Sequence, residues 1–361
     1  MKNNLQKRLT LYCLVFFVLI AGSSETTRGQ SGRQTDAQGG QAGTATRTPP
    51  PPGSDDDDEV IRTRTEEVLL PISVRDERGR PVAGLSADNF FVYEKGVRQD
   101  IASFNRRRVP ANIVLLLDAS GSVFSQMRLI RAAAVNFSRG LMPEDRISVM
   151  QFADKVELLQ DWTPATETKK IELALNFRYH PGEQTNFYEG LYTAAENQLR
   201  KVEGRRIIIL LTDGIDTAAR PKKSFAQALQ AVESAEASVY VVSLTASLRA
   251  MVERQTGGRL RRLLAGGYDP QYIAQVLRQI DEAEESLGKL AIGTGGRMFL
   301  PLEETELSPA YDAIAEELRT QYIITYTPKP RAAEGEWRQI RVLVTPGGYD
   351  VAARTGYMRR P

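Results

Sequence analysis

Carboxylate and hydroxyl side chains gather in three short segments of this sequence, at residues 118–122, 182–186 and 212–214. The first segment reads Asp-Ala-Ser-Gly-Ser, so its polar side chains alternate and converge if the loop curls around one point. Hydroxyls and a few carboxylates suit octahedral Mg²⁺, which retains some of its waters. If the three segments meet in the fold, we predict that they supply these metal ligands: Asp118, Ser120, Ser122, Thr185 and Asp213.

A cation held by so few charged groups stays electron-poor and keeps a coordination position for a carboxylate from outside. The sequence therefore favours a binding partner that presents a carboxylate. Mg²⁺ is the first choice of ion, with Mn²⁺ or Ca²⁺ as alternatives. Residues next to the predicted ligands, together with the nearby histidine, are expected to contact this partner: Gly121, Gln184, Asn186, Gly214 and His180.

Other kinds of site are excluded or disfavoured by residues that the chain lacks. Its one cysteine, Cys13, lies in an N-terminal apolar run, and its one histidine is His180. A zinc–thiolate site, a multi-histidine metal site and a disulfide are therefore ruled out, and a Ser-His-Asp triad is disfavoured. The formal net charge is only +2, and positive charges in residues 1–24 account for it, which indicates no nucleic-acid partner.

Two alternatives to a binding role stay open at this point. Asp118 could serve as the nucleophile or base of a metal-dependent hydrolase. Against this, Ser120 stands where an Asp-x-Asp hydrolase has its second acid, and no base system stands out. The chain could also be a structural module whose metal site is vestigial. We expect no enzyme activity and no small-molecule substrate.

The elements that position these side chains follow an α/β pattern. Residues 113–117 and 207–211 are continuous apolar runs, typical of strands buried on both faces of a parallel sheet. A polar segment follows each run, and such sheets bind ligands at the carboxyl ends of their strands. The alternation predicts a doubly wound, mostly parallel, Rossmann-like sheet. Further strands are predicted at 147–152, 156–159, 239–244 and 297–300, and helices at 124–141, 168–175, 186–200, 221–235 and 309–320, the last with Ser308 as N-cap.

Segments with shorter strands flank this core. Residues 68–104 and 321–354 alternate apolar stretches with turn residues, and we expect them to pair in one small β-sandwich-like module. The predicted division is an N-terminal β-segment at 60–108, the core domain at 109–320 and a C-terminal β-segment at 321–361. Within the core, residues 246–283 form a helical insert rich in arginine. This insert is either a docking surface for an acidic partner or an anionic polymer, or a solvated excursion of the chain.

The polar segments and their strands resemble the von Willebrand factor type A (VWFA) domain with a complete metal-ion-dependent adhesion site. The likeness covers residues 110–245 and 284–326, with Gly-Glu-Gln-Thr at 182–185 where the family usually has Gly-Gly-Thr. It implies that the three hydroxyls of the predicted set ligate the ion and that the two carboxylates act directly or through water. The flanking β-segments resemble more closely the VWFA-related domain family of acidobacterial proteins. The resemblance implies cation-dependent protein binding and adhesion, not catalysis.

The N-terminus is typical of a secreted protein. Lys2, Lys7 and Arg8 precede an apolar run at residues 9–22, and small residues follow it, so we predict a signal peptide at 1–24. Residues 25–59 lack large apolar side chains and end in an acidic run, which predicts a disordered tether. The expected location is secreted, periplasmic or on the cell envelope. If the signal stays uncleaved, it would tether the chain to the envelope.

Overall fold

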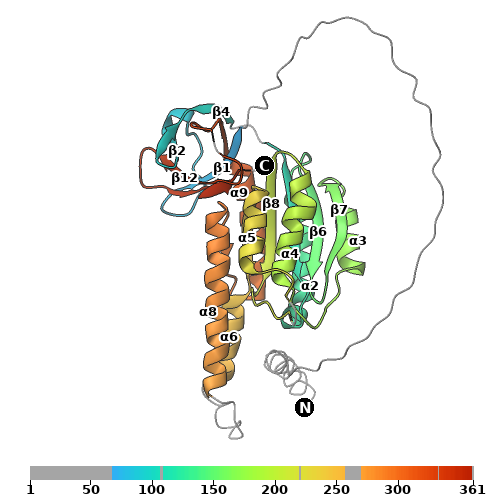
Figure 1. Cartoon of the computed structure of the whole chain (residues 1–361). Coiled ribbons are helices and arrows are strands. Elements are labelled where there is room, and N and C mark those ends of the chain that lie inside the picture. The colour runs from blue at the N-terminus through green and yellow to red at the C-terminus, as the bar shows by residue number, and fades with distance from the viewer. Residues whose placement is uncertain (1–66, 106–108, 219–220, 257–269, 332, 360–361) are drawn as a thin grey trace, which may run out of the picture.

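The computed structural model of the chain describes residues 67–105, 109–218, 221–256, 270–331 and 333–359 (Figure 1). The predicted signal peptide at 1–24, the linker at 25–59 and the middle of the arginine-rich insert at 257–269 lie outside the described residues. In the described part, no helix is both long enough and apolar enough to cross a membrane.

A six-stranded sheet forms the core, in the order β10-β9-β8-β5-β6-β7. All neighbours are parallel except β7, which runs antiparallel to β6 at one edge. The two strands predicted to be buried on both faces, β5 and β8, are neighbours at the centre, where the direction of winding reverses. The strands are β5 (Ala111–Asp118), β6 (Arg146–Phe152), β7 (Val156–Pro164), β8 (Arg205–Thr212), β9 (Ser238–Ser243) and β10 (Met298–Phe299).

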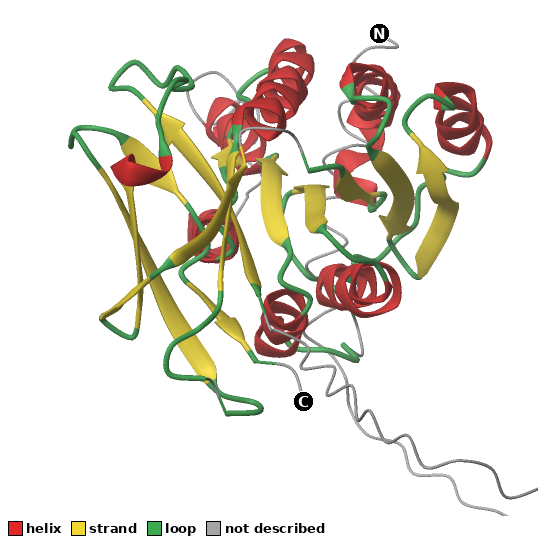
Figure 2. Cartoon of the chain, turned by 90° about the horizontal axis from the view of Figure 1, so that it is seen from above, coloured by secondary structure: helices red, strands yellow, loops and turns green. Residues whose placement is uncertain are grey.

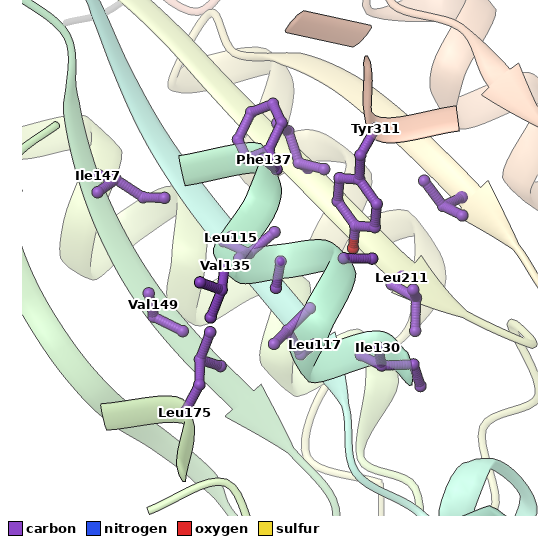
Figure 3. Close-up of a cluster of buried hydrophobic side chains, with 14 of the residues drawn as sticks. Leu115, Leu117, Ile130, Val135, Phe137, Ile147, Val149, Leu175, Leu211 and Tyr311 are labelled. Atoms are coloured by element: carbon purple, nitrogen blue, oxygen red, sulfur yellow. The ribbon is translucent and has the colours of Figure 1, made fainter. Parts of the chain in front are cut away.

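Helices cover both faces of this sheet, because successive side chains of a strand point to opposite faces. Leu115 and Leu117 of β5 pack against α2 (Met127–Gly140) and α9 (Leu307–Thr320), as Figure 3 shows. Val114 and Leu116, which alternate with them, belong to the cluster on the other face. Helix α3 (Thr168–Phe177) joins the first face, and α4 (Phe187–Thr193), α5 (Phe225–Ser234) and α8 (Pro270–Gly293) cover the second. The predicted doubly wound α/β core is confirmed.

The two ends of the chain build a separate pair of antiparallel sheets, ordered β13-β1-β11-β4 and β14-β12-β2-β3. Both sheets combine strands from before and after the core, since β1 pairs with β11 and β2 pairs with β12. Apolar side chains such as Leu70, Val92 and Ile340 meet between them. The strands are β1 (Val68–Arg75), β2 (Phe90–Glu94), β3 (Val97–Gln99), β4 (Ile101–Asn105), β11 (Tyr322–Tyr326), β12 (Trp337–Val344), β13 (Asp350–Ala352) and β14 (Gly356–Met358). This confirms the β-sandwich-like module, seen beside the core in Figure 2. The exact domain boundaries stay predictions.

The β-sandwich-like module lies at the edge of the core sheet where its parallel strands begin. Arg205, at the start of β8, donates hydrogen bonds to the carbonyls of Val109 (3.0 Å) and Leu318 (3.1 Å), which flank the two crossings between core and module. Arg354 of the module forms an ion pair of 2.9 Å with Glu236, just before β9. The carboxyl ends of the core strands therefore lie at the opposite edge, away from the module.

Local signals decide where the structure departs from the predicted elements. Helix α5 begins at Phe225 and not at 221, because Ser224 is its N-cap and accepts a hydrogen bond from the Gln227 N–H (3.3 Å). Ser308 is not an N-cap: a 3₁₀ turn at Glu304–Glu306 leads directly into α9, which begins at Leu307.

Some predicted elements also differ in length or type. The single helix predicted at 186–200 is α4 followed by a π turn (Ala194–Gln198) and a 3₁₀ turn (Leu199–Lys201). The start of the helix predicted at 124–141 is a 3₁₀ helix, Gly121–Gln126, that leads into α2. Strand β14 was not expected at all; it closes the edge of its sheet by pairing with β12.

Candidate metal centre at the carboxyl edge of the core sheet

The first polar loop follows β5 and folds back on itself. Asp118 is fully buried, and its Oδ1 accepts a hydrogen bond of 2.8 Å from the Ser120 N–H. The hydroxyl oxygens of Ser120 and Ser122 lie 3.0 Å apart. The alternate residues 118, 120 and 122 thus converge on one point, as their spacing predicted.

The second loop follows β8, the neighbour of β5, and is bound directly to the first. Thr212 donates its hydroxyl to Asp118 Oδ2 (2.7 Å) and accepts the Gly214 N–H (2.9 Å). Asp213, which is 4% exposed, accepts the Ile215 N–H at 3.1 Å. The two carboxylates therefore face one site at the point where the sheet reverses its winding, the position at which such sheets bind ligands.

The third loop carries Thr185, which is also buried. The Thr185 N–H donates to the Thr217 hydroxyl (2.9 Å), and the Thr217 N–H donates to the Thr185 carbonyl (3.1 Å). The Gly182 N–H donates to the Ala119 carbonyl at 2.8 Å, which joins this loop to the first one. All three polar segments predicted from the sequence therefore meet at one edge of the sheet.

The electrostatics of the centre favour a cation. Burial raises the pKa of Asp118 from 3.8 to about 7, and the neighbouring carboxylate of Asp213 adds to this rise, although hydrogen bonds from Ser120 and Thr212 oppose it. Burial likewise raises the pKa of Asp213, against a hydrogen bond from Ser122. No basic side chain of the described residues offsets the two buried acids. A divalent cation would supply the missing positive charge, so the residues present fit such an ion.

The donor set is specific in its chemistry. Across the part of the chain that the structure describes, no group of three or more His, Cys, Asp or Glu side chains is placed to hold a metal ion. The oxygens gathered here belong instead to two carboxylates and to hydroxyls. Such ligands suit Mg²⁺ that retains some of its waters better than they suit a transition-metal ion.

The residues expected to contact a partner occupy different positions around the centre. Gly121 is half-buried and opens the 3₁₀ helix, and Gln184 is exposed. Asn186 donates its side-chain amide to the Ala153 carbonyl (2.8 Å), so it holds the third loop. Gly214 is buried, and the exposed His180 has its Nε2 2.9 Å from the Phe177 carbonyl oxygen.

Sequence analysis missed the residues that hold the ligands in place. Thr212 lay inside a recognised polar segment, but nothing marked its hydroxyl as the partner of Asp118. Tyr179, fully buried, donates its hydroxyl to the Asp118 carbonyl. Asp154 accepts the backbone N–H groups of Glu183 (3.1 Å) and Gln184 (2.8 Å) and so shapes the third loop. No local pattern could reveal these contacts, since the partners are far apart in the sequence.

Comparison with known proteins identifies the core. A model of the von Willebrand factor type A domain matches residues 112–284, which span most of the six-stranded sheet and all three polar loops. Together with the sheet order, this match confirms a vWA-type α/β fold and the predicted resemblance at that level. No curated protein matches the chain.

Several solved structures resemble parts of the chain. The vWF domain of the pilus tip protein Mfa5 from Porphyromonas gingivalis is 21% identical, over 30% of this chain and 40% of its own, with a TM-score of 0.28. A von Willebrand factor type A protein from Catenulispora acidiphila is 10% identical over 83% of this chain and 75% of its own (TM-score 0.42). The pilus adhesin SpaC from Lactobacillus rhamnosus GG is 11% identical over 80% of this chain and 47% of its own, with a TM-score of 0.44. The chain thus spans less than half the length of the first and third of these proteins.

Proposed function

From a vWA-type core with two buried acids at its carboxyl edge, we propose that this protein binds a divalent cation and, through it, an acidic residue of a partner protein. The observation that carries the proposal is the burial of Asp118 and Asp213 together, with hydroxyls around them and no basic partner among the described residues. Buried like charges are unfavourable unless a cation neutralises them.

The predicted ligands divide by chemistry. The hydroxyls of Ser120, Ser122 and Thr185 would bind the ion directly, and Asp118 and Asp213 would bind it directly or through water. We propose Mg²⁺ as the ion, with Mn²⁺ or Ca²⁺ as alternatives. The cation would supply positive charge and a free coordination position, which gives the site the character of a metal-ion-dependent adhesion site.

Binding is favoured over hydrolysis by the state of Asp118. Its side chain is fully buried, and its two carboxylate oxygens accept hydrogen bonds from the Ser120 N–H and the Thr212 hydroxyl, so the group is held toward an ion seated among the loops and is not exposed to attack a substrate. His180 is exposed, and its Nε2 lies against a backbone carbonyl. We therefore propose a binding protein and not an enzyme.

The proposed role is adhesion or protein–protein interaction outside the cytoplasm. The signal-peptide pattern at 1–24 supports secretion, and the polar linker at 25–59 would hold the folded part away from an envelope surface. A core inserted between two β-segments supports the likeness to the acidobacterial VWFA-related family. The proposed partner is a protein, not a nucleic acid or a small-molecule substrate.

Calorimetric titration of Mg²⁺, Mn²⁺ and Ca²⁺ into the purified protein tests the proposal. We expect saturable binding to the wild type, and a loss of at least about tenfold in affinity in Asp118→Asn and Ser122→Ala. Ser125→Ala is the matched control, because Ser125 lies exposed on the same 3₁₀ helix. If no ion binds the wild type, or if Asp118→Asn binds as the wild type does, the proposed centre is wrong.

A further inference from the structure

A hollow of about 360 Å³ opens beside the candidate metal centre. We propose that it receives a large apolar side chain of the same partner that presents the acidic residue to the ion. This inference rests on the proposed function and adds a second point of recognition to it. We call the site the α6 hollow, after the helix α6 (Thr245–Thr256) that forms one wall. Its lining combines apolar residues with polar and charged ones: Leu244, Met251, Pro301, Leu302 and Leu307, and Gln126, Ser247, Arg254, Glu303, Glu304 and Thr305.

The hollow lies next to the metal centre. The Leu244 N–H donates to the Thr212 carbonyl at 2.9 Å, and the hydroxyl of that threonine holds Asp118. Gln126 ends the 3₁₀ helix that begins directly after Ser120. One wall of the hollow is therefore hydrogen-bonded to the second polar loop, and another continues the first. We infer that a segment whose carboxylate reaches the ion can also reach this hollow.

The helical insert builds the wall that distinguishes this hollow. Helices α6 and α8 run side by side past the end of the sheet (Figure 1), joined by an apolar cluster that includes Leu248 and Ile280. Ile215, two residues after Asp213, packs against the same cluster. Helix α6 is thus held in a set position relative to the metal loop. The insert, which the sequence left as either a docking surface or a solvated excursion, contributes a wall to a binding site.

The apolar residues of the lining fit an apolar side chain, and its polar and charged residues, among them Arg254, Glu303 and Glu304, fit the polar groups that flank such a side chain. Leu244 and Leu307 are buried at its base, and Met251 is half-buried on α6. At the rim, Leu302 is 52% exposed, and Phe124, on the 3₁₀ helix that ends at Gln126, is 63% exposed. Apolar side chains exposed beside a polar centre are typical of interaction sites. The volume suits one large side chain in a pocket, the usual anchor of a protein interface.

The partner that fits both sites is an exposed segment with an acidic residue close to a large apolar one. The carboxylate matches the positive centre, and the apolar side chain matches the hollow. The chain's own acidic run at residues 55–59 is followed directly by Val60 and Ile61, so a second copy of this chain would also present an acidic residue next to apolar ones. Such an occupant is an outcome that the experiment can reveal.

Selection of random peptides tests the proposal on the purified protein. Peptides displayed on phage are bound in Mg²⁺ and eluted with EDTA, and dissociation constants of selected peptides are then measured by fluorescence polarisation. Leu302→Asp places a charge at the rim, and Ser247→Trp fills the hollow from α6. The matched control is Leu173→Asp, since Leu173 is 56% exposed on α3, far from the lining. Mg²⁺ titration of each variant shows that it is folded and that its centre is intact.

We expect a consensus with one acidic and one large apolar residue at constant spacing. Dissociation constants should rise at least about tenfold in Leu302→Asp and Ser247→Trp, because burying one large apolar side chain contributes roughly that much affinity, and stay unchanged in Leu173→Asp. A purely acidic consensus, or equal binding to all variants, would overturn the α6 hollow and leave the proposed function standing. If no peptide elutes with EDTA, the proposed function fails and this inference with it.

Discussion

At the scale of single residues, the candidate centre depends on a carboxyl group whose ionised form is destabilised by the surrounding fold. Asp118 is fully buried beside Asp213, and this environment raises its pKa from 3.8 to about 7. A carboxyl whose pKa is higher in the folded than in the unfolded chain contributes stability that is fully present below its unfolded value. That contribution is lost as the pH rises through the pKa that the group has in the folded protein. Without metal, Asp118 therefore destabilises the protein near neutral pH.

Removal of metal should expose this cost. In EDTA, we expect the free energy of unfolding of the wild type to fall by about 2–3 kcal/mol between pH 5 and pH 8, relative to Asp118→Asn. Denaturant unfolding of both proteins at the two pH values measures the difference. Saturating Mg²⁺ should remove the loss in the wild type only, because the ion competes with the proton for the same carboxylate. Parallel pH profiles for the two proteins in EDTA would contradict the assignment.

At the scale of elements, the loop after β8 is shaped by contact with α8. Gly214 has φ +75°, in the left-handed region that favours glycine, and a Cβ at this position would lie 2.7 Å from Leu287 Cδ1. The loop therefore needs glycine both for its backbone conformation and for its approach to the helix. Since Asp213 immediately precedes Gly214, the position of one proposed metal ligand depends on how α8 packs.

Gly214→Ala should therefore disturb both stability and metal binding. We expect a loss of about 2–3 kcal/mol in stability, and an Mg²⁺ affinity that is at least about tenfold weaker. Gly79→Ala separates backbone strain from crowding, because Gly79 has φ +74° and a Cβ added there would meet no atom within 4 Å. That control should lose only about 1 kcal/mol and bind Mg²⁺ normally. Equal effects of the two substitutions on Mg²⁺ binding would count against the role of α8.

At the scale of the whole molecule, a buried charge cluster joins the β-module to the core. Glu317 of α9, only 1% exposed, pairs with Arg75 of β1 and with Arg297 (3.2 Å) before β10. It also accepts the Tyr240 hydroxyl of β9 at 3.1 Å. One carboxylate thus bonds to a strand of the module and to two places in the core sheet, at the edge opposite the metal centre.

Glu317→Gln should loosen the module from the core. Removing one partner leaves two arginines without their buried counter-charge, and we expect a loss of about 3–5 kcal/mol in the free energy of unfolding. Asp350→Asn is the control: its pair with Arg297 (2.9 Å) involves an aspartate that is 60% exposed, and its loss should cost less than about 1 kcal/mol. Mg²⁺ affinity should stay unchanged in both folded variants. A weaker affinity in Glu317→Gln would contradict the expectation that the charge cluster and the candidate metal centre, at opposite edges of the core sheet, act independently.

Local patterns in the chain were enough to predict the α/β core sheet and the edge at which its polar loops meet. The unbroken apolar runs at 113–117 and 207–211 predicted two strands buried on both faces of a parallel sheet, and the structure places them side by side at its centre. Because each run ends in polar residues, Asp118 and Asp213 were expected to meet at the carboxyl edge. These features follow from the order of apolar and polar residues, which the chain carries whatever its distant contacts.

Long-range contacts, in turn, explain what holds that site in place and what lies beside it. Thr212 binds Asp118 across 94 positions of sequence, and Tyr179 binds it across 61. Such bonds form only when the sheet closes, so no local pattern encodes them. The same holds for the insert: the sequence predicted a helical segment, but the packing of α6 and α8 against Ile215 and the hollow beside α6 depend on which apolar faces meet. Charge and periodicity describe one segment at a time, whereas a binding site is made between segments.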